Sequence, residues 1–82
     1  MELSELTRLS TRHTVLLSIE DVVERTSLSR RTIYNITNAG EFPQMLKLSE
    51  RRVAFVEAEI EAWIEDKMRL RDLENRQYSQ AL

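Results

Sequence analysis

The sequence predicts a mostly α-helical domain of the winged helix-turn-helix class, with three main helices and a small two-stranded β-hairpin as the wing. Two short amphipathic segments, over residues 18–26 and 29–39, are separated by only a few residues, and an arginine-rich hairpin pattern follows at once. Helices joined by so tight a turn must cross, which presents the second helix on a convex surface. In helix-turn-helix proteins this second helix enters the major groove of DNA.

Composition limits the classes of protein. The chain has 82 residues, no cysteine and a net charge of -2, so it fits one domain without disulfides or a thiolate metal site. Apolar runs are too short to span a membrane, and the N-terminus has no apolar signal segment, so we expect a cytoplasmic protein. The charge is segregated: residues 25–52 carry six basic and two acidic residues, whereas residues 53–66 carry five acidic residues and no basic one. Such a dipolar chain can orient on a polyanion, although segregation of this size is also common on small helical proteins.

The first helix has a clear start and end in the sequence. Ser18 is a good N-cap and Asp21 stands where a capping box needs an acid, while Leu17 can pack on Val22 as a hydrophobic staple. Leu28 is the apolar residue expected inside a tight turn between two helices.

The second helix is predicted to begin after the cap Ser29, to run to residue 38 or 39, and to stop at Gly40. At 100° per residue, Ile33 and Ile36 share the inner side of this helix. The outer face, with Arg30 at its margin, has no carboxylate and consists of Arg31, Tyr34, Asn35 and Asn38. Arginine suits guanine or phosphate and asparagine suits adenine. The alternatives are an ordinary polar surface and, for Tyr34, a ring lying against the hairpin.

The wing is predicted from apolar runs at residues 45–48 and 53–55 around a charged tip. In a winged fold, Arg51 and Arg52 at this tip would lie near the phosphate backbone or the minor groove. The alternative is pairing with Glu50 or with an acid of the next helix, and we expect that one of the two arginines pairs in this way.

The last helix should begin near residues 56–57 and cover the back of the first two helices with Val56, Ile60, Trp63, Ile64 and Met68. Beyond Met68 it either continues as a solvated extension or frays, and Leu70 and Leu73 offer a small apolar surface for self-association.

We therefore divide the chain into a polar N-terminal arm (1–14), the winged domain (15–68) and a C-terminal helical extension or tail (69–82). The predicted core is one cluster of Leu28, Ile33, Ile36, Phe55, Ile60, Trp63 and Ile64.

Four segments in series, at residues 28–34, 40–43, 47–55 and 62–64, resemble the AlpA family of phage and prophage regulators. The resemblance implies a MerR-like, excisionase-like winged helix-turn-helix protein of bacteria that binds DNA. It would regulate transcription of an integrase gene, act as an excisionase (a recombination directionality factor), or do both. Phe55 departs from the tryptophan common in the family, but both are aromatic core residues. Taken with the resemblance, the candidate DNA-binding residues are Ser29, Arg30, Arg31, Thr32, Tyr34, Asn35, Asn38, Lys47, Arg51 and Arg52.

Other functions are less well supported by the residues. His13 is the only histidine and has no recognisable partners, so we expect no enzyme, metal or cofactor. The effector domain and full dimerisation helix of MerR proteins are not evident, so we expect no small-molecule effector. The expected partner is double-stranded DNA, with integrase or a second copy on adjacent sites. The rival interpretation is a protein-interaction module or antirepressor that uses this fold without DNA, and salt dependence distinguishes the two because DNA binding releases counterions.

Overall fold

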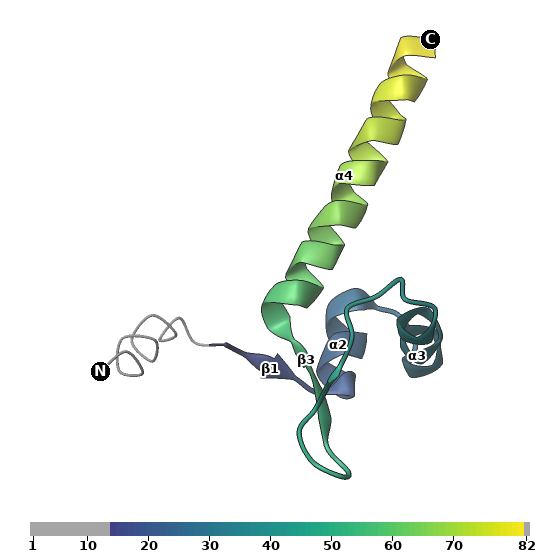
Figure 1. Ribbon diagram of the computed structural model, residues 1–82. Coiled ribbons are helices and arrows are strands. Elements are labelled where there is room, and N and C mark those ends of the chain that lie inside the picture. Colours follow the sequence, from purple (N-terminus) through teal and green to yellow (C-terminus); the bar gives the residue numbers. More distant parts are fainter. Residues whose placement is uncertain (1–13, 82) are drawn as a thin grey trace, which may run out of the picture.

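The computed structural model describes residues 14–81, with side chains as far as residue 76. The predicted N-terminal arm, including His13, therefore lies outside the described residues except for Thr14. The elements run in the order β1 (Leu16–Leu17), α2 (Ile19–Thr26), α3 (Arg30–Asn38), β2 (Leu46–Lys47), β3 (Val53–Val56) and α4 (Glu57–Ala81) (Figure 1). This arrangement confirms a mostly helical winged helix-turn-helix fold. No helix within residues 14–81 is long and apolar enough to cross a membrane.

The sheet has three antiparallel strands in the order β1-β3-β2, one more than the predicted hairpin. Leu46 of β2 lies opposite Ala54, and Leu17 of β1 lies opposite Phe55. The side chain of Leu17 is only 4% exposed and packs in the same core cluster as Val22, as expected for a hydrophobic staple. The backbone of Leu17 also pairs with β3 and so extends the sheet. A strand of two residues is too short to show the alternation of apolar and polar residues that marks a strand, so β1 was not predicted.

The helix ends follow local signals, as predicted. Ser18 and Asp21 form a reciprocal capping box with two hydrogen bonds of 3.1 Å. Ser29 caps α3, where its Oγ accepts a hydrogen bond from the backbone N–H of Thr32 at 3.1 Å. Gly40, at a φ of 77°, closes α3: its N–H donates to the carbonyl of Thr37 at 3.1 Å, and the next N–H donates to the carbonyl of Ile36 at 2.9 Å. These two bonds form a Schellman motif.

Among the residues that the structure describes, Ser27 and Gly40 have left-handed backbone conformations, and they allow a paired stability prediction. A Cβ added at Gly40 would meet no atom within 4 Å, so Gly40→Ala should destabilise the domain by about 1 kcal/mol through backbone strain alone. Ser27 ends α2 at a φ of 63°, and Ser27→Gly should relieve strain and raise the free energy of unfolding by up to about 1 kcal/mol. Urea denaturation of both variants should give shifts of opposite sign, and two shifts of the same sign would contradict this interpretation.

The core is a single cluster between the sheet and the helices. Its buried members are Leu17, Val22, Ile33, Phe42, Phe55 and Ile60. Of the predicted core, Leu28, Ile36, Trp63 and Ile64 are only partly buried and pack around this cluster. Phe42 was missing from the prediction, yet its ring meets Phe55 edge-on at 5.9 Å and Trp63 at 4.8 Å between centroids. The turn after α3 carries Phe42 inward, and no periodic pattern marks it.

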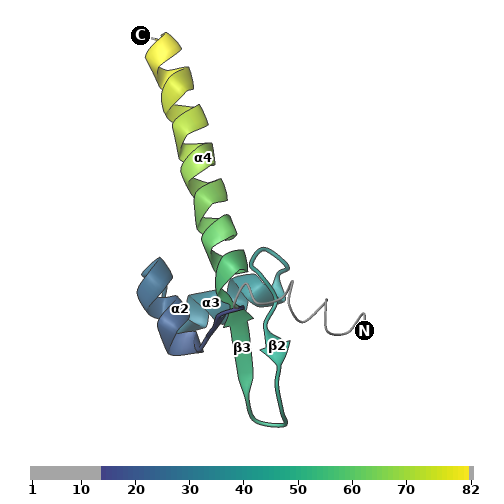
Figure 2. The ribbon, with the colours of Figure 1, turned by 90° about the vertical axis from the view of Figure 1, so that its left-hand side faces the viewer.

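Helix α4 starts at Glu57, as expected, and continues to residue 81 as a projection away from the rest of the molecule (Figures 1 and 2). Ile60 is fully buried, but Met68 is 48% exposed. Met68 borders a hollow beside Arg25 and Thr26 at the end of α2, so it covers the first two helices only in part. The continuation of the helix beyond Met68 agrees with the extension rather than with fraying.

Candidate nucleic-acid interface

Helix α3 divides into an inner and an outer face. Ile33 is fully buried, and Thr37 is buried with its hydroxyl donating to the carbonyl of Ile33 at 2.6 Å. On the other side Arg31, Asn35 and Asn38 are all exposed. The face is thus free of carboxylates and available to a partner, and the buried side fixes its orientation.

Three candidate residues at the start of α3 have contacts within the chain. The guanidinium of Arg30 forms an ion pair with Glu20 of α2, although both side chains are more than half exposed. The Ser29 hydroxyl, besides capping α3, donates to the hydroxyl of Thr32 at 2.9 Å. Ser29 and Thr32 therefore shape the helix start, while Arg30 links the two helices of the motif.

The wing ends in a compact turn that holds its arginines outward. The N–H of Leu48 donates to the carbonyl of Arg52 at 2.8 Å, and the N–H of Arg52 donates to the carbonyl of Ser49 at 3.4 Å. Arg51 and Arg52 are exposed, and so is Lys47 in β2. Among the side chains that the structure describes, neither wing arginine has an acidic partner within 4 Å. The expectation that one of them pairs with Glu50 or with an acid of the next helix is therefore wrong.

The wing and α3 lie next to each other. A hollow of about 370 Å³ has Tyr34 of α3, Arg51, Arg52 and Val53 of the wing, and the start of α2 in its lining. Tyr34 is half-buried beside the hairpin, which favours the interpretation of its ring as the edge of the core. Tyr34 of α3 and the two wing arginines therefore border one hollow, together with Glu20 of α2.

Arg25 is one of the basic residues counted in the sequence, but its role in the fold is structural. Its guanidinium lies 2.8 Å from the carboxylate of Glu57 and 3.7 Å from that of Glu61, both on α4. The hydrogen bond to Glu57 raises the pKa of Arg25 above its ordinary value. This contact ties α2 to α4 and explains why two of the acids on α4 lie toward the body of the domain.

Two crossing helices followed by a β-hairpin with exposed arginines define a protein of the winged helix-turn-helix class. Residues 15–70 match the family model described as "Prophage CP4-57 regulatory protein (AlpA)". The chain belongs to this AlpA family of regulatory proteins.

A relative from Enterobacteria phage P4, "Uncharacterized protein ORF88", is 38% identical to this chain over 48 residues. The match covers 58% of this chain and 54% of the relative, so the chain spans about half the length of the curated relative that it matches. Each comparison extends over more than half of the chain rather than over an isolated motif, and both relate the chain to phage proteins.

Proposed function

We propose that this protein is a sequence-specific DNA-binding regulator of phage, prophage or genomic-island origin, with α3 in the major groove and the wing on the DNA backbone. The observation that supports this most is that the two exposed wing arginines border a hollow with Tyr34 of α3 and have no acidic partner within 4 Å among the described side chains, while the outer face of α3 carries no carboxylate. A cationic wing next to a neutral-to-cationic helix face is complementary to a polyanion.

The side chains on α3 suit base reading. Arg31 and Asn35 are four residues apart and so lie one turn apart on the same face. A guanidinium can donate two hydrogen bonds to guanine, and a carboxamide can both donate to and accept from adenine. Arg51 and Arg52 at the wing tip would contact phosphate or a narrow minor groove, where arginine is favoured.

Within the phage regulatory family, two roles use the same DNA contact. The protein would control transcription of an integrase gene, or it would act as an excisionase that shapes DNA at an attachment site together with integrase or further copies of itself. Both roles place the protein in the bacterial cytoplasm, at the nucleoid. A footprint on the DNA flanking the gene separates them, because protection of a promoter favours the regulator and protection of repeated sites beside an attachment site favours the excisionase.

The wing gives the first binding prediction. Replacing Arg51 and Arg52 together by Ala should weaken binding to cognate and random duplexes alike, because phosphate contacts carry no sequence information. The slope of log affinity against log salt should flatten by roughly one unit per lost contact. A matched control is Arg71→Ala with Arg76→Ala, which removes the same charge from the exposed part of α4. If both pairs of changes lower affinity and slope equally, the wing has no specific role.

A further inference from the structure

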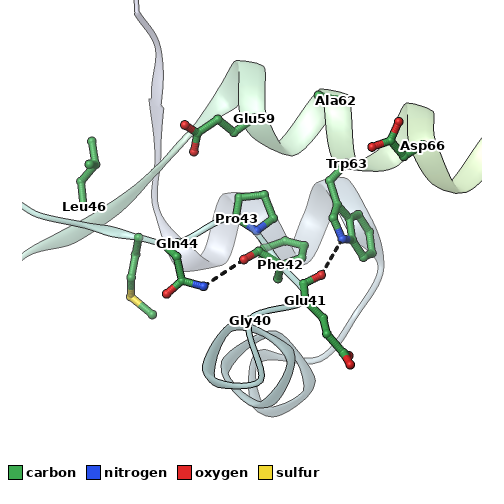
Figure 3. A pocket seen from close by; sticks show the side chains of 11 residues that line it. Gly40, Glu41, Phe42, Pro43, Gln44, Leu46, Glu59, Ala62, Trp63 and Asp66 are labelled. Atoms are coloured by element: carbon green, nitrogen blue, oxygen red, sulfur yellow. Dashed lines mark hydrogen bonds between the residues drawn. The ribbon is translucent and has the colours of Figure 1, made fainter.

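The hollow between α3 and the wing contains one group whose charge does not suit a polyanion. Arg51 and Arg52 line it, and among its lining residues the one carboxylate belongs to Glu20, in the first turn of α2. A larger groove of about 730 Å³, between the segment after α3 and α4, has three carboxylates and no basic side chain in its lining (Figure 3). That groove does not suit DNA, whereas the hollow beside the wing does. Glu20 is therefore the acid that a phosphate would meet on the proposed DNA side.

Glu20 is joined to the first residue of α3. Its Oε2 accepts a hydrogen bond from Nη2 of Arg30, and the two groups form an ion pair between the helices. Arg30 precedes Tyr34 by one helical turn, so both residues fall on the same side of α3, and Tyr34 lines the hollow. The carboxylate therefore holds the guanidinium of Arg30 close to the surface that the wing arginines border.

The ion pair leaves much of the guanidinium available to a partner. Arginine carries several N–H donors in one plane, and the hydrogen bond to Glu20 uses only Nη2. The side chain of Arg30 is 56% exposed, so its remaining donors are accessible. A guanidinium held in this way can offer its free edge to guanine. Less side-chain entropy is then lost on binding, because the side chain is already ordered.

We infer that Glu20 is a positioning residue that makes the contact of Arg30 with DNA selective for sequence, an inference that rests on the proposed function. In the paired state, Arg30 presents its free donors to a base edge. A move of Arg30 to a phosphate would break the pair and leave the Glu20 carboxylate uncompensated beside the DNA backbone, which is unfavourable. Glu20 therefore weakens binding to duplexes of any sequence and favours those that place guanine within reach of Arg30.

Replacing Glu20 by Ala should change the two kinds of binding differently. Arg30 would be free to contact phosphate, so affinity for a scrambled duplex should rise about threefold or more, with a salt slope steeper by roughly one unit. Affinity for a duplex taken from a footprint beside the gene should not rise with it. The preference for the footprinted duplex should therefore fall about fivefold or more, in the range of one bidentate base contact. Competition binding against the two duplexes measures this preference.

Glu24→Ala is the matched control for the loss of charge. Glu24 is exposed one turn further along α2, does not line the hollow, and has no basic partner within 4 Å among the described side chains. The preference should survive this change. Circular dichroism melts should show both variants folded, because exposed ion pairs contribute little to stability. An equal loss of preference in Glu20→Ala and Glu24→Ala would overturn the inference.

A double-mutant cycle shows whether Glu20 acts through Arg30. Arg30→Ala removes the base contact, so adding Glu20→Ala to it should cost no further preference and should not steepen the salt slope. If Glu20→Ala lowers the preference as much without Arg30 as with it, Glu20 does not position this side chain and the inference fails.

The wild-type chain separates this inference from the proposed function. A wild-type chain that binds both duplexes equally would contradict the proposed function and the inference together. A wild-type chain that prefers the footprinted duplex, with a Glu20→Ala variant that keeps the whole preference, would overturn the inference and leave the proposed function standing.

Discussion

Phe55→Ala is expected to lower the free energy of unfolding by about 3–5 kcal/mol, the cost of removing a large aromatic side chain from a packed core. Phe55 is fully buried at the centre of the sheet, where it lies opposite Leu17 and meets Phe42 edge-on. A domain of this size has a total stability of the same order, so the variant could be largely unfolded at room temperature. Urea denaturation followed by the fluorescence of Trp63, the only tryptophan, measures the loss.

Two further variants make this result interpretable. Val53→Ala, on the same strand but 39% exposed, should cost clearly less. Trp63→Ala, followed by circular dichroism, should also cost less than Phe55→Ala, because Trp63 is only partly buried beside the core. The helical spacing of the apolar residues predicts Trp63 inside the core, whereas the structure places it at the edge. Equal losses at residues 53 and 55 would show that the domain does not depend on the cluster around Phe55.

The second large effect is expected on sequence preference. Arg31→Ala or Asn35→Ala should each reduce the preference for the cognate over a scrambled duplex by about 1–3 kcal/mol, the usual value of one bidentate base contact. Binding to random DNA should change less, because phosphate contacts supply most of it. Competition binding against cognate and scrambled duplexes measures both quantities for each variant.

The matched control for this series is Asn38→Ala, at the end of α3. A helix in the major groove contacts bases mainly through its N-terminal turns, so Asn38 should matter less than Arg31 or Asn35. Thermal stability should hardly change in any of the three, because all three side chains are exposed. Equal losses on both duplexes would make these residues backbone contacts, and no loss on either would remove α3 from the interface.

The parts of the fold that could be predicted are those specified by neighbouring residues. The helix ends could be predicted because their signals act within a few residues. These signals are the capping box of Ser18 and Asp21, the Ser29 cap and the left-handed Gly40. The outer face of α3 follows from helical periodicity in the same way.

The parts that could not be predicted depend on residues distant in the sequence. The β1 strand exists because Leu17 meets Phe55, 38 positions away, and Phe42 is buried because β3 and α4 cover it. The ion pair of Arg30 with Glu20 and the lack of an acidic partner for the wing arginines depend on where side chains from different elements meet. Composition supplies candidate charges, but only the packed fold decides which of them pair.

We propose that this chain reads DNA through α3 and the wing, and equilibrium binding across a range of salt concentrations tests this proposal most directly. The full chain should be titrated onto a duplex taken from a footprint beside its gene and onto a scrambled duplex of the same length. We predict that log affinity falls linearly with log salt for both duplexes, and that the footprinted duplex binds more tightly at every salt concentration. An affinity that is equal for the two duplexes, or that does not respond to salt, would contradict this claim.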